Sequence, residues 1–392
     1  MLSSRVVRFI VYAIIGVFAV SRMWVVLREY QDVDYSPLSM ISTISLILMS
    51  IVFVLLSLTS LLYSGINRLI LAITIISLVS TCLYGREDIM LLKQIIFILF
   101  WAAVFFLFYL LSFNDEKTIR EGNKFFYLLL IPVTVLLLMS NVLRGSMGYK
   151  VGQLGNNMIF YLLTMLPWLL VAKERILRLI TVLFVLGLSV VTMKRSAMTA
   201  CVIITMSVIY LEYVKGNPNK ARAVCLSLVL AFSAFGLMFY ANAVNDGAAM
   251  ERVENLEEDE GSGRLERYKD VIRLLRDEDI HGKLLLGHGY RTVEASLGES
   301  ASAHNDFLEV SYDYGIIGLI VYALIHLALI KRLLYLRKIE SVYYEGYLIS
   351  YMIFFIMSMV SHLIIYPTYF IFLTSYWGAI EGHLMSIDNN DQ

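Results

Sequence analysis

The chain is 392 residues long, and 59% of its residues are hydrophobic while 16% are charged, with a mean hydropathy of +0.72. This composition leaves too little polar surface to cover a soluble globule of that length, so we expect a polytopic membrane protein. The formal net charge is zero and the three cysteines have no paired spacing, so nothing indicates nucleic acid as a partner, a disulfide framework or a zinc site.

Apolar runs recur along most of the chain. A helix needs roughly 20 residues to cross a ~30 Å hydrocarbon core, and about twelve runs approach that length. They are 9–26, 39–62, 67–84, 94–113, 125–142, 157–172, 177–193, 197–213, 223–242, 315–330, 346–364 and 368–384. We therefore expect an all-α polytopic membrane protein with about twelve transmembrane helices, and a total between about ten and twelve fits the pattern.

The distribution of Lys and Arg predicts the orientation of these spans. The short basic N-terminus precedes an apolar run without a small-residue cleavage site, which indicates a retained first span. With that N-terminus in the cytoplasm, about sixteen basic residues fall on inner connections and about eight on short outer ones, as the positive-inside rule favours. Both termini are then cytoplasmic, and the long polar interval before residue 314 is external.

That polar interval divides the chain into three parts. We expect an N-terminal transmembrane bundle over 1–242, a large external catalytic loop over 243–313, and C-terminal transmembrane helices with a short cytoplasmic tail over 314–392. The loop opens with an acidic run over 251–260, which we interpret as a solvated segment. Because the loop then brings Arg, His, Asn and Glu together, we expect the chemistry to take place there.

An outer connection earlier in the chain carries an acidic pair, Asp32-Val33-Asp34. Two carboxylates at this spacing could hold Mg²⁺ or Mn²⁺, which would favour a metal-dependent transferase. A bare Asp-x-Asp is a weak signal, and no other cluster of His, Asp and Glu has the spacing of metal ligands. We therefore expect neither a metal nor another cofactor.

Lys194 and Arg195 separate two apolar runs with almost no loop between them. A cation at membrane depth costs ~2.5–3.5 kcal/mol even on the insertion scale, so such charges usually have a partner. We interpret Arg195 as catalytic and Lys194 as a substrate-binding residue. The alternative is that both side chains extend to the interface and mark a tight turn.

Apolar residues at helical spacing over 265–275 predict an amphipathic helix of about three to four turns in the loop. Gly261-Ser262-Gly263 precedes it and would leave backbone amides at a helix N-terminus, where the helix dipole favours an anion. Arg264 lies in the first turn with Arg267 three residues on, and a guanidinium beside free amides is a good phosphate clamp. Ser262, Gly263, Arg264 and Arg267 are therefore site candidates, against the alternative of an ordinary capped helix with solvated arginines.

His304 precedes an apolar run by about ten residues and is followed by Asn305 and Glu309. A histidine at a membrane–water boundary with polar neighbours is a candidate general base or diphosphate ligand. Asn305 and Glu309 are candidate substrate-binding residues. By contrast, His326 and His362 lie inside apolar runs, where a hydrogen-bonded interior residue is the simpler interpretation.

A second glycine turn, Gly287-His288-Gly289, lies between the helix and His304. His288 can be an ordinary turn residue. Arg291, which follows the turn, is a further candidate substrate-binding residue.

Five motifs follow one another in the C-terminal half of the chain: Lys194-Arg195-Ser196, Ser262-Gly263-Arg264, Leu285 to Gly289, His304 to Glu309 and Gly315 to Ile320. Their order resembles that of the O-antigen ligase and Wzy-type polymerase superfamily. Tyr268 stands where relatives often carry a tryptophan, which leaves the subfamily open.

The resemblance implies a C-type glycosyltransferase architecture in the bacterial inner membrane, with an outward-facing site that uses an undecaprenyl-diphosphate-linked oligosaccharide. Cations must neutralise the diphosphate leaving group where no metal is evident, so Arg195 and Arg264 are expected to bind it with Arg267 in support. His304 would accept the proton of the attacking hydroxyl. Membrane lipid, a flippase and a chain-length regulator are the partners that such a reaction implies.

Two alternatives remain beside the preferred function of a polymerase for O-antigen, capsule or exopolysaccharide. A ligase would transfer the glycan to lipid A core, and it is expected to have a strongly basic outer surface, whereas this loop balances its charges. A transporter or flippase for lipid-linked glycans would usually have internal repeats, and no convincing repeat is visible.

Overall fold

The structure is a computed structural model that describes residues 4–28, 37–56, 65–146, 156–172, 174–192, 194–211, 264–277, 283–298 and 302–390. Within these ranges every regular element is a helix, as the composition predicts. The helices are α1 (Ser4–Arg28), α2 (Pro37–Leu56), α3 (Gly65–Tyr84), α4 (Leu91–Asn114), α5 (Lys117–Ser146), α6 (Ile159–Leu169), α7 (Arg175–Val191), α8 (Arg195–Ile209), α11 (Arg264–Asp277), α12 (Lys283–Leu286), α13 (Thr292–Leu297), α14 (Asp306–Asp313), α15 (Gly315–Lys338), α16 (Tyr344–Val360) and α17 (Pro367–Asn390).

Five helices in the described part of the chain are long and apolar enough to cross a membrane by length and composition. They cover Arg5–Val25, Gly65–Tyr84, Leu91–Asn114, Lys117–Leu143 and Gly315–Lys338. The expected total of about twelve is not reached on this criterion, because apolar helices such as α6, α8 and α16 are shorter than a full span. The predicted span 223–242 and the expected domain boundary at 242 lie outside the described residues.

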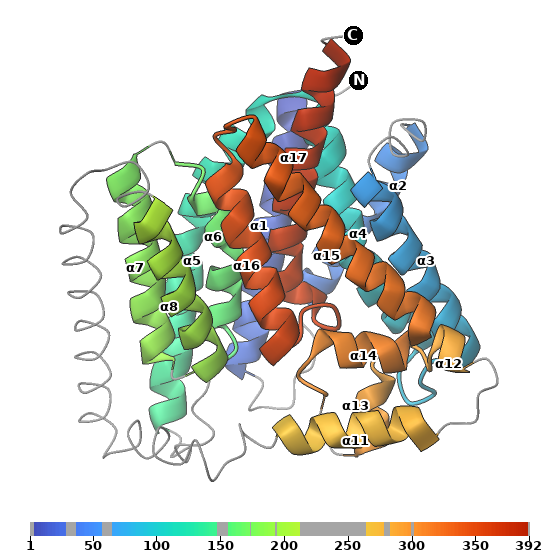
Figure 1. Cartoon of the computed structure of the whole chain (residues 1–392). Coiled ribbons are helices and arrows are strands. Elements are labelled where there is room, and N and C mark those ends of the chain that lie inside the picture. Colours follow the sequence, from blue (N-terminus) through green and yellow to red (C-terminus); the bar gives the residue numbers. More distant parts are fainter. Residues whose placement is uncertain are drawn as a thin grey trace.

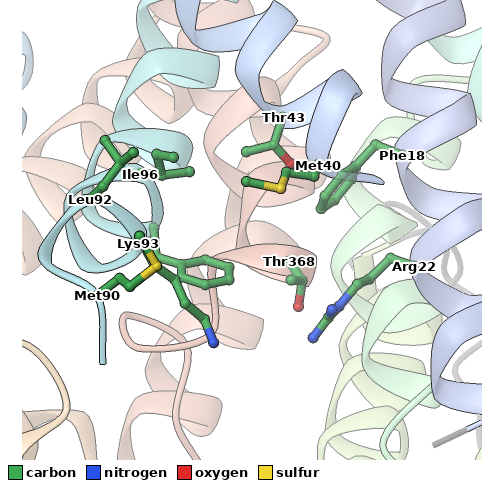
Figure 2. A pocket seen from close by; sticks show the side chains of 10 residues that line it. Phe18, Arg22, Met40, Thr43, Met90, Leu92, Lys93, Ile96 and Thr368 are labelled. Carbon is green, nitrogen blue, oxygen red and sulfur yellow. The ribbon is translucent and has the colours of Figure 1, made fainter. Parts of the chain in front are cut away.

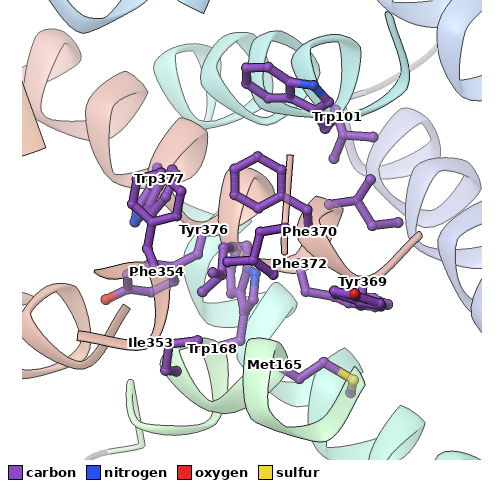
Figure 3. Close-up of a cluster of buried hydrophobic side chains, with 14 of the residues drawn as sticks. Trp101, Met165, Trp168, Ile353, Phe354, Tyr369, Phe370, Phe372, Tyr376 and Trp377 are labelled. Atoms are coloured by element: carbon purple, nitrogen blue, oxygen red, sulfur yellow. The ribbon is translucent and has the colours of Figure 1, made fainter. Parts of the chain in front are cut away.

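Helix α6 is an internal helix and not a lipid-facing span. Its 11 residues cover roughly 17 Å, about half of a hydrocarbon core, and all of them are buried. Trp168 lies in the centre of a large aromatic cluster with residues of α17 such as Phe372 and Tyr376 (Figure 3). A helix that is apolar on all sides is stable only when it is surrounded, which is the case here.

The most extensive helix pairing joins α4 to α17. Gly378 and Gly382 lie one turn apart on α17 and allow the two backbones to touch. A Cβ added at Gly378 would lie 2.1 Å from the Phe105 carbonyl oxygen, and one at Gly382 would lie 2.0 Å from that of Tyr109. This small-xxx-small spacing is a common device for close helix packing in membranes.

Ion pairs between helices hold one end of the bundle together. The Arg8 side chain on α1 is 2% exposed, donates to Glu121 at 2.7 Å and also pairs with Asp115. On the C-terminal side, Arg332 of α15 donates to both carboxylate oxygens of the buried Glu381 on α17, at 2.7 and 2.6 Å. Figure 1 shows both termini at this end and helices α11 to α13 at the opposite end.

The helices at that opposite end have a small core of their own. Val271 of α11, Val293 of α13, Ala303 and Tyr312 of α14 are buried against one another. The predicted amphipathic helix is thus present as α11, but its buried stripe is narrower than the sequence pattern suggests. Leu265 and Ile272 are each 53% exposed, and among the described helices α11 packs mainly on α13 and α14.

Candidate functional site

Helix α14 supports the site, and two buried aspartates attach it to its surroundings. Asp306 accepts hydrogen bonds from the Leu363 backbone N–H at 3.0 Å and from the Tyr322 hydroxyl at 3.0 Å. Asp313 accepts from the backbone N–H groups of Arg291 at 2.7 Å and Thr292 at 3.0 Å. Burial raises the pKa of each aspartate to about 7.

The spacing of these two aspartates is a sequence signal that the predicted site did not include. Asp306 and Asp313 are seven residues apart, so they lie on one face of a helix two turns apart. Their backbone partners are at 291–293 and 363–364, and α14 therefore joins the loop to the corner between α16 and α17.

The turn Gly287-His288-Gly289 has a structural role. The His288 backbone N–H donates to the Tyr312 carbonyl at 3.1 Å, and the two rings stack at 4.1 Å. Gly289 has φ +96°, and a Cβ there would lie 2.7 Å from the Cα of Gly85. The turn therefore anchors the loop against the end of α3, and His288 contributes to this anchoring through its contacts with Tyr312.

Three residues of the predicted site have partners inside the protein. Asn305 is the N-cap of α14, where its side-chain oxygen accepts from the backbone N–H groups of Phe307 and Leu308 at 2.9 and 3.2 Å. Glu309 is fully buried and accepts from the Ala303 N–H at 2.6 Å, and burial followed by the charge of Asp313 raises its pKa well above the usual range.

Arg291, the third of these residues, forms a bidentate pair with Glu294. Its guanidinium donates to the two carboxylate oxygens at 3.0 and 2.7 Å, and Glu294 is 6% exposed. Arg291 also donates to the Tyr366 hydroxyl at 3.2 Å and lies over that ring at 4.9 Å. The pair thus fixes the corner between α16 and α17 against α13.

His304 lies at the centre of the candidate site, immediately before α14. Its backbone has φ +53°, in the left-handed region, and its carbonyl accepts from the Tyr268 hydroxyl of α11 at 3.3 Å. Its ring stacks on the His362 ring at 4.9 Å, and its Nδ1 is buried and has no hydrogen-bond partner among the residues that the structure describes. His304 shares this feature with His288 and His326, so its candidacy rests on its neighbours as well as on the unsatisfied nitrogen.

His362 belongs to the site, although the sequence favoured an interior residue of a span. Its Nδ1 lies 2.9 Å from the Ser302 hydroxyl, and its ring stacks on Tyr366 at 4.3 Å. The apolar run 346–364, which was expected to form one span, contains His362. The structure ends α16 at Val360, so His362 lies in the corner that follows.

Positive charges from distant parts of the chain act on these two histidines. Burial, followed by the charges of Arg264, Arg267 and Lys194, lowers the pKa of His304 to about 3. Burial also lowers the pKa of His362 well below its usual value. The charges of His304, Lys194, Arg291 and Arg264 lower it further. We call Lys194, Arg264 and Arg267 the cationic cluster, since among the described residues they supply the charges that act on His304.

The remaining candidates are placed as follows. Arg195 is the first residue of α8, and its backbone carbonyl accepts a hydrogen bond from the Thr199 hydroxyl at 3.1 Å. Of the two neighbouring cations, Lys194 is the one whose charge lowers the pKa values of His304 and His362. Ser262 and Gly263, the pair Asp32 and Asp34, and the acidic run lie outside the described residues. The described ranges contain no group of three or more His, Cys, Asp or Glu residues that could hold a metal ion.

The comparison with protein families matches this region. Residues 179–323 match the family model described as O-antigen ligase. The matched segment runs from α7 into α15 and includes the cationic cluster and His304. A search among curated proteins finds no match.

Proposed function

Through residues 179–323 this chain belongs to the superfamily of O-antigen ligases and Wzy-type polymerases, and we propose that it polymerises a polysaccharide by transferring a glycan from an undecaprenyl-diphosphate carrier. The observation that carries the proposal is that the charges of all three residues of the cationic cluster act on His304, a half-buried histidine whose ring stacks on that of His362. Three cations around one small polar site are suited to a ligand with several negative charges, such as a diphosphate.

The reaction breaks the bond between the anomeric carbon of the donor glycan and the diphosphate oxygen, which keeps the electron pair. A hydroxyl of the acceptor sugar forms the new glycosidic bond to that carbon. The cationic cluster stabilises the charge that develops on the leaving diphosphate, which is the largest electrostatic demand of the reaction. Arg264 and Arg267 are three residues apart on α11, so both can contact one diphosphate group.

His304 accepts the proton that the acceptor hydroxyl loses. With a pKa of about 3 the ring is neutral at physiological pH and has one unprotonated nitrogen. Binding of the anionic donor offsets the charges of the cluster and raises the pKa of His304 toward the working pH, where a general base is most effective. The donor thereby prepares the base that the next step needs.

The acceptor distinguishes a polymerase from a ligase. The matching family is described as O-antigen ligase, and this match does not distinguish the two functions. We prefer a polymerase, whose acceptor is itself a lipid-linked repeat unit, because the outer loop over 243–313 has more acidic than basic residues and does not offer a strongly basic surface to a phosphate-rich core. A flippase and a chain-length regulator are the partner proteins proposed for it.

The proposed location is the bacterial inner membrane, with cytoplasmic termini and external helices α11 to α14. The arrangement in Figure 1, with the termini at one end and α11 to α13 at the other, supports opposite sides of the membrane for these two regions. Donor and acceptor glycans would then meet outside the cytoplasm.

Substitutions in the cluster test this function in purified protein reconstituted with a synthetic lipid-linked repeat unit. Arg264→Ala and His304→Ala are expected to lower the rate of polymer formation by about 100-fold or more, the usual contribution of a general base or a leaving-group clamp. Arg264→Lys is expected to restore little, because Lys does not make bidentate contacts. Arg276→Ala, on an exposed part of the same helix, is the matched control.

The same assay tests Lys194, which precedes α8, and Arg195, the first residue of that helix. Lys194→Ala and Arg195→Ala are both expected to be strongly impaired if both contact the diphosphate.

Full activity in Arg264→Lys would contradict the clamp, and wild-type activity in His304→Ala would make His304 a structural residue. Immunoblots of membranes show whether each variant is present at a normal level.

A further inference from the structure

A cavity outside the cationic cluster lies between α1, α2, α4 and the start of α17. Its volume is about 280 Å³, near the lower end of the range of ~300–1,000 Å³ typical of small-molecule sites. Most of its lining is apolar and includes Met40, Leu92 and Phe97. We call it the lateral cavity.

Two cations lie among these apolar walls. Arg22 comes from α1 and Lys93 from α4, and Thr368 of α17 adds a hydroxyl. Figure 2 shows the three side chains extending toward the same side of the cavity, away from Thr43. In the described part of the chain no carboxylate lines the cavity.

The walls of the cavity continue into surface that faces outward. Met40 is 49% exposed, Leu92 is 59% exposed and Met90 is 74% exposed. On helices of a membrane bundle, exposed apolar side chains of this kind contact lipid tails. A chain in the bilayer can therefore enter the cavity from the side.

The lateral cavity is connected to the candidate site through a few residues. The Phe97 ring at the cavity stacks on the Tyr290 ring at 6.3 Å, and the Tyr290 hydroxyl donates to the Ile365 carbonyl at 2.8 Å. Thr368 follows Tyr366, whose ring stacks on His362, by two residues. The corner between α16 and α17 therefore lies between the cavity and the cationic cluster.

We propose that the lateral cavity binds a second polyprenyl phosphate lipid, the carrier of the acceptor repeat unit. Arg22 and Lys93 would pair with its phosphate groups and the apolar walls would hold the first part of its tail. A soluble anion would pair with the two cations but would not contact the apolar walls favourably. A neutral lipid would contact the walls but would not pair with the cations. This inference rests on the proposed polymerase function, since of the two candidate enzymes only a polymerase has two substrates linked to a polyprenyl carrier.

The test counts bound lipids. The purified full-length chain in detergent is mixed with undecaprenyl phosphate, and bound equivalents are counted by native mass spectrometry. The wild type is expected to bind two equivalents. Arg22→Gln/Lys93→Gln is expected to lose one of them, with its dissociation constant raised by about tenfold or more, which corresponds to ~1.4 kcal/mol. Lys331→Gln/Arg337→Gln, which removes the same charges from α15, is the matched control and keeps both.

A second variant avoids any effect of charge on folding. Ile96 lines the cavity, and Ile96→Trp fills it while both cations remain. This variant is also expected to lose one equivalent. Two equivalents in both Ile96→Trp and Arg22→Gln/Lys93→Gln would overturn the proposal, as would displacement of the second lipid by an equal amount of phosphatidylglycerol.

The outcome is separable from a failure of the proposed function. Arg264→Gln/Arg267→Gln is expected to lose the other equivalent, which the cationic cluster holds. If this variant kept two equivalents while Arg22→Gln/Lys93→Gln kept one, the lateral cavity would remain a lipid site and the diphosphate clamp would be contradicted. The reverse pattern would retain the clamp and refute the second site.

Discussion

His304 and Glu309 lie five residues apart at the start of α14, and their surroundings move their pKa values in opposite directions. Burial disfavours the charged form of both. The cationic cluster reinforces this effect at His304, and the nearby carboxylate of Asp313 reinforces it at Glu309. The surroundings therefore favour the neutral form of both side chains, but only at His304 do positive charges contribute that an anionic substrate would offset.

The pH dependence of catalysis follows from the charges around His304. A base must be unprotonated, so the rate falls as the pH drops through the pKa of His304 in the substrate complex. Arg267→Gln removes one of the charges that lower this pKa, so its acid limb is expected at higher pH than that of the wild type. The measurement is kcat as a function of pH in reconstituted vesicles. Arg276→Gln serves as the control, and coincident acid limbs in wild type and Arg267→Gln would argue against His304 as the base.

Glu309 offers a test between a structural and a substrate-binding role. Burial and the charge of Asp313 raise its pKa, which favours the protonated carboxyl, and Glu309→Gln preserves its shape and the acceptor for the Ala303 N–H. We expect near-normal activity and thermal stability for this variant. Glu309→Ala leaves the N–H unpaired and a void, and is expected to lose about 2 kcal/mol or more of stability. Activity assays and thermal unfolding of the two variants distinguish the structural from the substrate-binding role. A Glu309→Gln variant as inactive as Glu309→Ala would mean that a charged carboxylate is needed.

At the scale of the element, helix length and helix surface decide which apolar runs face lipid. Helix α6 is apolar on all sides and too short to span the membrane, and it lies inside the bundle. Helix α17 lies against α4 through a surface made of glycines. The segment that continues from the site corner into α17 is thus held rigidly against the core, and this positions His362 and Tyr366.

The glycine contacts predict a graded loss of stability. Gly378→Ala and Gly382→Ala each place a Cβ within about 2.1 Å of a carbonyl oxygen of α4, so the helices must separate. The expected cost is roughly 1–3 kcal/mol, the usual range for overpacking. Gly187→Ala on α7 is the matched control, because nothing lies within 4 Å of its added Cβ. The melting temperature in nanodiscs is the readout, and equal values for all three variants would refute the close contact.

At the scale of the whole molecule, the site is assembled at one end from segments far apart in the chain. The turn before α8, the start of α11, the residues before α14 and the corner before α17 all contribute to it. The lateral cavity adds α1, α2 and α4 on the other side of that corner. This arrangement suits a reaction in which two lipid-linked substrates approach from the membrane and react at its surface.

Deletion of the gene from its host distinguishes polymerase from ligase. Loss of a polymerase leaves single repeat units on the final acceptor, or short lipid-linked units, without a ladder of longer chains. Loss of a ligase leaves bare cores while long polymer accumulates on the carrier. We expect the first pattern on gels of surface polysaccharide. Long carrier-linked polymer in the deletion strain would show that the second function is correct.

The sequence by itself determined the membrane class, the helical content and the polar loop with its principal cations. These follow from local properties, since an apolar run, an amphipathic period and a cation beside a span retain their meaning wherever the chain folds. Arg264, Arg267, Lys194 and His304 were therefore candidates on sequence grounds alone, and the structure adds that the three charges act on His304.

Only the tertiary structure decided which of the polar residues face the site and which hold it together. Arg291, Asn305 and Glu309 have the same residue types as ligands, but their hydrogen bonds go to Glu294, to the start of α14 and to Ala303. His362 was hidden within an apolar run, because hydropathy does not show that a helix ends two residues before it. The place of His362 depends on its stacking on His304, which lies far from it along the chain, and local sequence patterns carry no information about such a contact. The partners of Arg291, Asn305 and Glu309 are close in sequence, but residue types and spacing do not show which nearby group each side chain binds once the segment has folded.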